Sequence, residues 1–294
     1  MMRWLPLPFV AWCAGCWLHG ERRWELLLFG IGVPLLAYTS DASRRFLLGI
    51  LPMALLALIY DAMRFVRDVG LSPERVHLCD LRALDMRIAS IDGGSVHDYL
   101  QAHATPALDI ACAIPYGTFV YVTLAFAIWL YVRDRAALTR FAWSFLALNI
   151  AGFITYHIYP AAAPWYYHAY GCQVDLTSRA SEGPNLARVD AWLGVGYFAA
   201  FYGRSNDVFG AVPSLHVGYP LLIVRYAWPL TRALARSAAL AFFAAMCFAA
   251  VYLDHHWIID VLLGIVYTLV VDFAVRLVAS PTPSATLQRA ASGP

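Results

Sequence analysis

Long runs of apolar residues, separated by polar connections, dominate the chain. Two short runs come first, at residues 4–18 and 24–38, and we expect them to form an accessory helical hairpin. Six later runs are each close to the ~20 residues with which a helix crosses the hydrocarbon core of a bilayer. They occupy residues 46–63, 107–132, 141–158, 214–230, 237–253 and 257–279. The pattern therefore predicts an all-α integral membrane protein with six core helices.

The apolar runs divide the chain into three parts. Residues 1–43 hold the N-terminal accessory apolar helices, and residues 44–279 form a six-helix membrane domain. Residues 280–294, where Pro, Ser and Gly recur, are expected to be a disordered cytoplasmic tail. Both runs of the first part are short for a span, so they either cross the membrane, lie in its interface or act as an uncleaved signal anchor.

The composition agrees with a membrane protein and removes several classes of function. Hydrophobic residues make up 61% of the chain and the mean hydropathy is +0.60, against roughly 45–50% apolar residues in soluble domains. All 21 basic residues are Arg, which excludes mechanisms that need a lysine ammonium. The net charge of +2 comes without a basic stripe, so we expect no nucleic-acid partner.

Arginines in the short connections predict the orientation in the membrane. By the positive-inside rule these connections lie in the cytoplasm. The longer connections, residues 64–106 and 159–213, and the brief turn at residues 254–256 then lie outside. This topology fits a bacterial inner membrane with a periplasmic site or a Golgi-type membrane with a luminal site. The arginines concerned are Arg44, Arg45, Arg133, Arg135, Arg140, Arg232, Arg236, Arg276 and Arg289.

The outer connections contain a second kind of signal. Apolar residues at helical spacing predict an amphipathic helix over residues 74–91, which lies along the membrane surface or packs within an outer cap. Cys79 and Cys172 lie in the two long connections and can form a disulfide only if both face an oxidising compartment. Cys13 and Cys16 form a C-x-x-C without a second pair, which is a poor indication of a metal site.

Three ionisable side chains stand at the start of the last apolar run, in His255-His256-Trp257-Ile258-Ile259-Asp260. If this segment is helical, His256 and Asp260 lie on one face, four residues apart. The carboxylate can then accept a hydrogen bond from one imidazole nitrogen and leave the other free. The spacing predicts a nucleophile or base with the group that orients it.

A second polar cluster lies in Val208-Phe-Gly-Ala-Val-Pro-Ser-Leu-His-Val-Gly-Tyr-Pro220. Ser214 directly precedes an apolar helix and is suited to cap it, so free backbone amides there can hold a phosphate. His216 follows as a candidate acid. The predicted topology puts this helix start and His256 on the same outer face, although 40 residues separate the two histidines.

These two segments resemble the second and third signature motifs of the type 2 phosphatidic acid phosphatase superfamily, and most closely its inositol phosphorylceramide synthase branch. The segments are VFGAVPSLHVG and YLDHHWIIDVLLG, and the upstream YPAAAPWYY at residues 159–167 is similar to a stretch of that branch. The resemblance implies a six-helix transmembrane phosphatase or phosphotransferase core over most of residues 44–279.

The resemblance also implies roles for individual residues. His256 would attack the phosphorus of a phospholipid to form a phosphohistidine, with Asp260 holding its other ring nitrogen. His216 would protonate the departing oxygen and then deprotonate the acceptor. Ser214 and neighbouring amides would bind phosphoryl oxygens, and His255 would shape the site or contact the head group. This scheme requires no metal and no cofactor.

The chain departs from the phosphatase branch in its positive charges. It has no Lys and no Arg-Pro pair, and Ala250 stands where that branch has an arginine. We expect Arg204, ten residues before Ser214, to supply the missing charge, with Arg179 and Arg188 as alternatives. The loss of these arginines favours the ceramide-acting branch, and therefore transfer over hydrolysis.

The predicted function is a membrane phosphotransferase that moves a phosphorylated head group from a phospholipid donor to a ceramide-like acceptor. Phosphoinositol from phosphatidylinositol is the plausible group, with diacylglycerol released. The alternative enzyme is a lipid phosphate phosphatase that uses water. A transporter or scaffold whose two histidines and Asp260 line a path or ligate zinc is the non-enzymatic alternative. The oligomeric state stays open.

Overall fold

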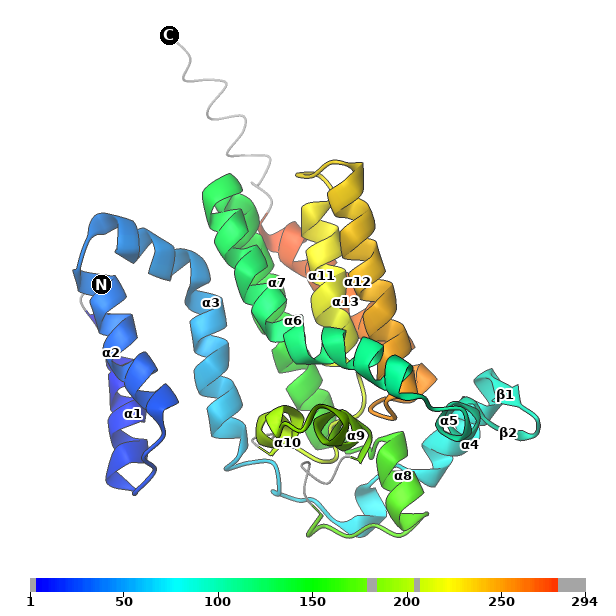
Figure 1. Ribbon diagram of the computed structural model, residues 1–294. Helices are drawn as coiled ribbons and strands as arrows, with labels where there is room; N and C mark the ends of the chain where they lie inside the picture. The colour runs from blue at the N-terminus through cyan, green and yellow to red at the C-terminus, as the bar shows by residue number, and fades with distance from the viewer. Residues whose placement is uncertain (1–3, 179–183, 204–206, 280–294) are drawn as a thin grey trace.

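The fold is a bundle of long helices with a cap of short elements at one end (Figure 1). The computed structural model describes residues 4–178, 184–203 and 207–279. The predicted tail at residues 280–294, Arg179 and Arg204 lie outside these ranges. The one sheet in the described ranges is an antiparallel pair, β1 (Ser90–Ile91) and β2 (Gly94–Ser95), with Ser90 opposite Ser95.

Five of the described helices are long and apolar enough to cross a membrane, which confirms an all-α membrane protein. The remaining predicted core run forms α11 (Leu215–Ala227), whose 13 residues extend only about 20 Å. It ends at Trp228, whose own dihedrals are still helical, because Pro229 has no amide hydrogen with which to continue the helical bonds. The five long helices are α3 (Asp41–Met63), α6 (Pro106–Arg133), α7 (Arg135–Ile158), α12 (Ala233–Tyr252) and α13 (Ile258–Ala279).

The short helix α11 lies at the centre of the bundle, where it packs against α6, α7, α12 and α13. Gly218 permits this packing. A Cβ there would lie 2.8 Å from a Leu148 methyl of α7 and 2.9 Å from the Thr268 hydroxyl of α13, both closer than van der Waals contact. The apolar sequence of α11 is buried nearly all round, as expected for a helix enclosed by others.

The two N-terminal runs form α1 (Leu7–Leu18) and α2 (Trp24–Tyr38), which pack on each other and, through α2, on α3. In Figure 1 they stand at the side of the bundle. Asp61 near the end of α3 accepts hydrogen bonds from Trp12 Nε1 and Arg23 NH2, each at 2.7 Å. These bonds tie the loop end of the hairpin to α3.

Short elements form a cap at the end of the bundle where α11 and α13 begin (Figure 1). The cap combines a 3₁₀ turn with helices from both long outer connections. Because these segments pack against the turn between α12 and α13, they position that turn. The elements are the 3₁₀ turn Pro73–Arg75, α4 (Cys79–Ile88), α5 (Val96–Ala102), α8 (Pro164–Tyr170), α9 (Pro184–Leu193) and α10 (Tyr197–Tyr202).

The prediction of one amphipathic helix over residues 74–91 is wrong at both ends. Only α4 is α-helical, and the chain before it is extended because His77 bonds to the second outer connection. The amide of His77 donates to Pro160 O and its carbonyl accepts from Ala162 N, both at 2.9 Å. Leu78 and Leu81 are buried in the cap core. The helix therefore packs within the cap, one of the two alternatives.

Cys79 and Cys172 form a disulfide with their Cα atoms 5.7 Å apart, which links the start of α4 to the segment after α8. The bond joins residues 93 positions apart and so closes a long loop. The other cysteines, Cys13, Cys16, Cys112 and Cys247, are free.

Thiol counting tests this disulfide. We expect denatured, unreduced protein to take four labels of a thiol reagent per chain, and reduced protein to take six. Replacing Cys79 and Cys172 together by Ser should lower stability by about 2–4 kcal/mol, because the unfolded chain is then less constrained. Cys247→Ser is the control and should leave the difference of two labels intact. Six labels without reduction would refute the bond.

Candidate active site

The predicted histidines meet at the end of the bundle that carries the cap. His216 lies in the first turn of α11, and His256 lies in the turn between α12 and α13. His216 Nδ1 is 3.0 Å from His256 Nε2, a hydrogen-bonding distance between residues 40 positions apart. The structure therefore brings together the side chains that the two sequence segments contribute.

Direct backbone packing holds the two segments against each other. The Ser214 amide donates to the Asp260 carbonyl at 3.0 Å. A Cβ at Gly264 would lie 2.4 Å from the Ser214 carbonyl oxygen, so only glycine fits there. Ser214 is fully buried, and its hydroxyl accepts from the Val217 amide at 3.4 Å, which confirms its role as the cap of α11.

The turn before α13 is shaped by its backbone. The amides of His255 and His256 both donate to Ala250 O, at 3.1 and 3.0 Å. Asp254 adopts a left-handed conformation with φ of 60°, which reverses the chain at this point. Trp257 is fully buried, and its indole donates to Ala162 O at 2.9 Å. These bonds fix the direction in which the His256 ring points.

The His256 ring is oriented by a backbone carbonyl. His256 Nδ1 lies 2.9 Å from Ala211 O, so Nδ1 carries the proton, and the lone pair of Nε2 faces His216 Nδ1. Asp260 Oδ2 lies 3.7 Å from Nδ1 and accepts from the Trp257 amide at 2.8 Å. Asp260 thus supports the ring by its charge and by holding the turn, while Ala211 makes the hydrogen bond expected of Asp260.

Aromatic rings surround His216 and His255. Tyr116 of α6 stacks on His216 with ring centroids 4.7 Å apart, and Phe119 lies 4.9 Å from the same ring. The Tyr202 hydroxyl of α10 is 3.4 Å from His216 Nε2. Sequence reasoning missed these residues, because aromatic side chains within apolar helices look the same whether they pack in a core or line a site.

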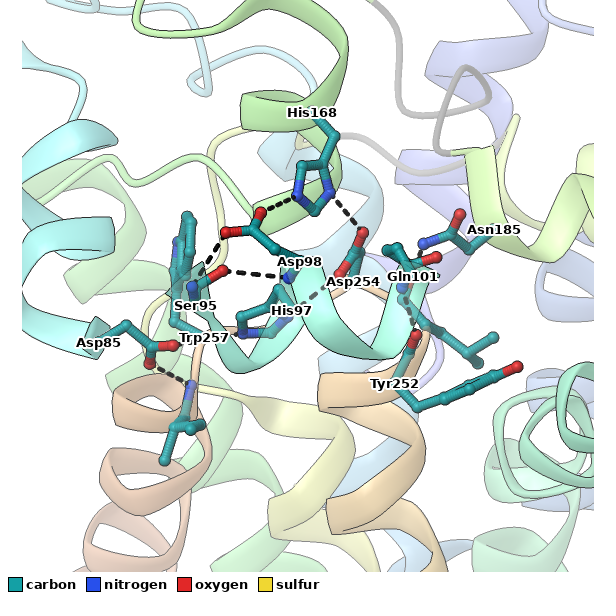
Figure 2. A network of polar contacts seen from close by, with 12 residues as sticks. Asp85, Ser95, His97, Asp98, Gln101, His168, Asn185, Tyr252, Asp254 and Trp257 are labelled. Carbon is teal, nitrogen blue, oxygen red and sulfur yellow. Dashed lines mark hydrogen bonds and ion pairs between the residues drawn. The ribbon is translucent and has the colours of Figure 1, made fainter. Parts of the chain in front are cut away.

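A network of acids and imidazoles lies against the other side of the turn (Figure 2). Asp254 accepts from His97 Nδ1 at 3.1 Å and from His168 Nδ1 at 2.7 Å. His97 is fully buried, and its Nε2 is 3.4 Å from Asp85 Oδ2, an ion-pair contact. Asp85 Oδ1 accepts from the Ile258 amide at 2.7 Å. The network therefore holds both ends of the turn that carries His256.

The outer part of this network continues to α4. His168 Nε2 lies 3.0 Å from Asp98 Oδ1, and the Arg82 guanidinium bonds both oxygens of Asp98 at 3.1 and 2.8 Å. Burial opposes charge on His97, but the hydrogen bonds to Asp254 and Asp85 outweigh it and raise the pKa of His97 to about 9. The bond to Asp254 likewise raises the pKa of His168.

Arg188, one of the arginines considered for the phosphate, is paired within the protein in this structure. Its Nε and NH2 donate to the two oxygens of Asp109 at 3.1 and 2.8 Å, and its NH1 donates to Gln101 at 2.8 Å. The acid therefore neutralises this arginine. Arg204 and Arg179 lie outside the described residues.

The aromatic stretch at residues 159–167 has a packing role. Trp165 and Tyr166 are buried in the cap core. The Trp165 amide donates to Asp254 O at 3.0 Å, and Ala161 pairs with the segment before Ser214 through Phe209 O and the Ala211 amide. The stretch thus joins the first outer connection to both segments of the site.

Comparisons with known proteins place the chain in a family. A family model described as the PAP2 superfamily matches residues 90–274. The chain is 34% identical to a phosphoinositol dihydroceramide synthase of Bacteroides thetaiotaomicron, over 82% of this chain and 77% of the relative. It is 28% identical to an inositol phosphorylceramide synthase catalytic subunit of Saccharomyces cerevisiae, over 80% of this chain and 57% of that one. No solved structure matches the chain.

Gly264→Ala tests the contact that joins the two segments. The added methyl group would press on the backbone of Ser214, so we expect a loss of about 1–3 kcal/mol of stability, measured by thermal unfolding in detergent. Gly32→Ala is the control, because a Cβ there meets nothing within 4 Å. A variant at Gly264 as stable as the Gly32 variant would contradict the contact.

The charge of His97 predicts a dependence of stability on pH. Because its pKa rises from 6.5 to about 9 on folding, the protonated ring stabilises the cap fully below pH 6.5, and this contribution is lost as the pH approaches 9. His97→Gln should flatten the fall of the unfolding midpoint over this window. It should not abolish the fall, because the pKa of His168 is also raised.

The matched control for His97 is His103, an exposed histidine at the end of the same helix α5. His103→Gln should keep the slope of the parent protein. Identical slopes in the His97 variant and the parent would show that the network carries no such charge.

Proposed function

The chain belongs to the PAP2 superfamily, in its inositol phosphorylceramide synthase-like branch, and from this premise we propose that it transfers phosphoinositol from phosphatidylinositol to a ceramide-like hydroxyl. The coarser activity, lipid phosphotransfer in a membrane, follows from its relatives. The finer one is supported by the contact of His216 Nδ1 with His256 Nε2 at 3.0 Å. A nucleophile and an acid that meet directly can serve both halves of a double displacement.

In the first half-reaction, His256 Nε2 attacks the phosphorus of the donor. The N–P bond forms while the bond from phosphorus to the diacylglycerol oxygen breaks, and His216 protonates that oxygen. His256 Nδ1 keeps its proton and donates it in a hydrogen bond to Ala211 O. The Asp260 carboxylate, 3.7 Å from Nδ1, stabilises the positive charge of the ring. Diacylglycerol leaves, and phosphoinositol stays on His256.

In the second half-reaction, His216 is left without the proton it donated and acts as a base. It takes the proton of the acceptor hydroxyl, whose oxygen attacks the phosphorus as the N–P bond to His256 breaks. The ceramide-like lipid leaves with the phosphoinositol group, and both histidines return to their starting protonation. Water in place of the lipid hydroxyl would give the competing phosphatase reaction.

The phosphoryl group must separate the two rings. In the structure His216 and His256 bond to each other, so entry of the donor has to break this contact. Burial within the aromatic rings excludes water and strengthens the electrostatic contribution of each donor group. The rings therefore meet only when no phosphoryl group lies between them.

We assign the phosphoryl oxygens to the N-terminus of α11. The Ser214 amide donates to Asp260 O, and the Ser214 hydroxyl accepts from the Val217 amide. The hydroxyl hydrogen of Ser214 and the amides of Leu215 and His216 are therefore the donors suited to the phosphate, and the helix dipole adds to their effect. Ser214 holds them in place, and His255 contacts the substrate. Arg204, which precedes α11, supplies the positive charge in this proposal.

We place the site on the non-cytoplasmic side of the membrane, in a periplasm or a Golgi-type lumen. The arginine-rich connections are at the opposite end of the helices. The Cys79–Cys172 bond of the cap supports the same orientation, because disulfides persist in oxidising compartments. Both lipids can reach a site at this depth from the leaflet itself.

An assay with phosphatidylinositol labelled in the inositol ring tests the proposal. We expect a labelled product that depends on added ceramide and is lost at least about 10³-fold in His256→Ala and His216→Ala, because each removes a group that takes part in both half-reactions. Asp260→Asn should lose about 10²-fold or more. Without ceramide, the parent protein should retain ring label after denaturation, and His256→Ala should not.

His103→Ala is the matched control for the histidine variants, since this exposed ring lies in the cap outside the site. Release of free phosphate from a lipid phosphomonoester, without any ceramide-dependent product, would overturn transfer in favour of hydrolysis.

A further inference from the structure

Two neighbouring rings of the site each carry a buried polar atom without a hydrogen-bond partner within the part of the chain that the structure describes. These atoms are the Tyr116 hydroxyl oxygen and His255 Nε2, and Asp260 Oδ1 is a third such atom in the site. Tyr116 is fully buried, with 0% of its surface exposed. The two rings are neighbours, with centroids 5.1 Å apart and an angle of 41° between them. The unpartnered atoms of Tyr116 and His255 therefore belong to a single cluster.

Such atoms are costly in a folded protein. A buried donor or acceptor without a partner costs about 1–3 kcal/mol, and most buried polar side chains in proteins are satisfied. Asp85 and Asp260 each also have one oxygen without a hydrogen bond, but the other oxygen of each carboxylate accepts one, from the amides of Ile258 and Trp257. The unpartnered pair is thus a place where a ligand can recover the lost hydrogen bonds.

Tyr116 and His255 lie beside His216, the proposed proton donor and acceptor. Tyr116 stacks on His216 at 4.7 Å as well as contacting His255. Tyr202 closes the same cluster, with its ring 5.1 Å from His255 and its hydroxyl 3.4 Å from His216 Nε2. In the proposed mechanism His216 protonates one lipid oxygen and deprotonates another, so a substrate oxygen must come to this place.

The chemistry of the pair matches a hydroxyl group. Burial first, and then the neighbouring His256, lower the pKa of His255 to about 3, so its ring is neutral at physiological pH. A phenol donates and accepts, and a neutral imidazole nitrogen does one or the other according to its tautomer. A hydroxyl, which both donates and accepts, satisfies the pair in either tautomer, whereas an anion would need donors from both.

We infer that Tyr116 and His255 together bind a hydroxyl group of a substrate beside His216. This inference rests on the proposed function for the identity of the lipids. The hydroxyl belongs either to the ceramide-like acceptor or to the inositol ring of the donor. Tyr116 is then a specificity residue of the transferase, contributed by α6 from outside both sequence motifs.

Tyr116→Phe tests the inference because it removes only the hydroxyl and keeps the ring that stacks on His216. Lipid binding is measured by native mass spectrometry in a His256→Ala background, with ceramide and phosphatidylinositol as separate probes, so no turnover is needed. We expect binding of one of the two lipids to weaken by about 5–150-fold, the loss of a buried hydrogen bond. The weakened lipid identifies the source of the hydroxyl.

His255→Asn and the double variant complete a thermodynamic cycle. If both residues hold the same hydroxyl, the double variant should bind that lipid no more weakly than the weaker single variant. Tyr226→Phe is the matched control. Tyr226 is also a buried tyrosine of the core, about 15 Å further along α11 from His216. The Tyr226→Phe protein should therefore bind both lipids as the parent protein does.

In the active enzyme, the Michaelis constant for the same lipid should rise in Tyr116→Phe. Unchanged binding of both lipids would overturn the inference, as would an equal loss for both or fully additive single variants, since these indicate a packing role. Failure of the proposed function looks different, because the parent protein would then form no ceramide-dependent product whatever the state of Tyr116.

Discussion

The contact between Ser214 and the first two turns of α13 is the constraint on which the site depends. The Ser214 amide bonds to Asp260 O, and the missing side chain of Gly264 lets the two backbones touch. A helix start and a helix turn from distant parts of the chain are thereby held at a fixed separation. Every distance between His216 and His256 follows from this packing, because each ring is only two or four residues from the contact.

The cap fixes the turn that carries His256, and thereby the direction in which the ring of this proposed nucleophile points. Polar groups in the turn are buried, and each of the three carboxylates Asp85, Asp98 and Asp254 is bonded within the network of Figure 2. Charged imidazoles offset the repulsion that three acids in one place would otherwise create. The disulfide and the stretch at residues 159–167 attach this network to the rest of the outer connections.

The three histidines of the site are chemically alike but have different hydrogen bonds and neighbours. The rings of His216 and His256 face each other. The Ala211 carbonyl accepts a hydrogen bond from His256 Nδ1, so the proton of His256 stays on the nitrogen that points away from His216. His255, their neighbour, sits among aromatic rings and stays neutral. The different roles proposed for the three rings, as nucleophile, acid and substrate contact, therefore rest on what surrounds each ring.

The sequence by itself determined the membrane class and the long helices, and it singled out His216, His256 and Asp260 as the candidate site residues that the structure brings together. Apolar run length and motif spacing are local properties, and ionisable groups at the ends of apolar runs are rare enough to be noticed. Only the tertiary structure decided that Ala211 rather than Asp260 bonds the His256 ring, that Asp109 neutralises Arg188, that His77 interrupts the helix predicted at residues 74–91, and that Tyr116 borders the site. These outcomes depend on backbone carbonyls, long-range pairs and the packing of ordinary aromatic residues, none of which leaves a distinct pattern along the chain.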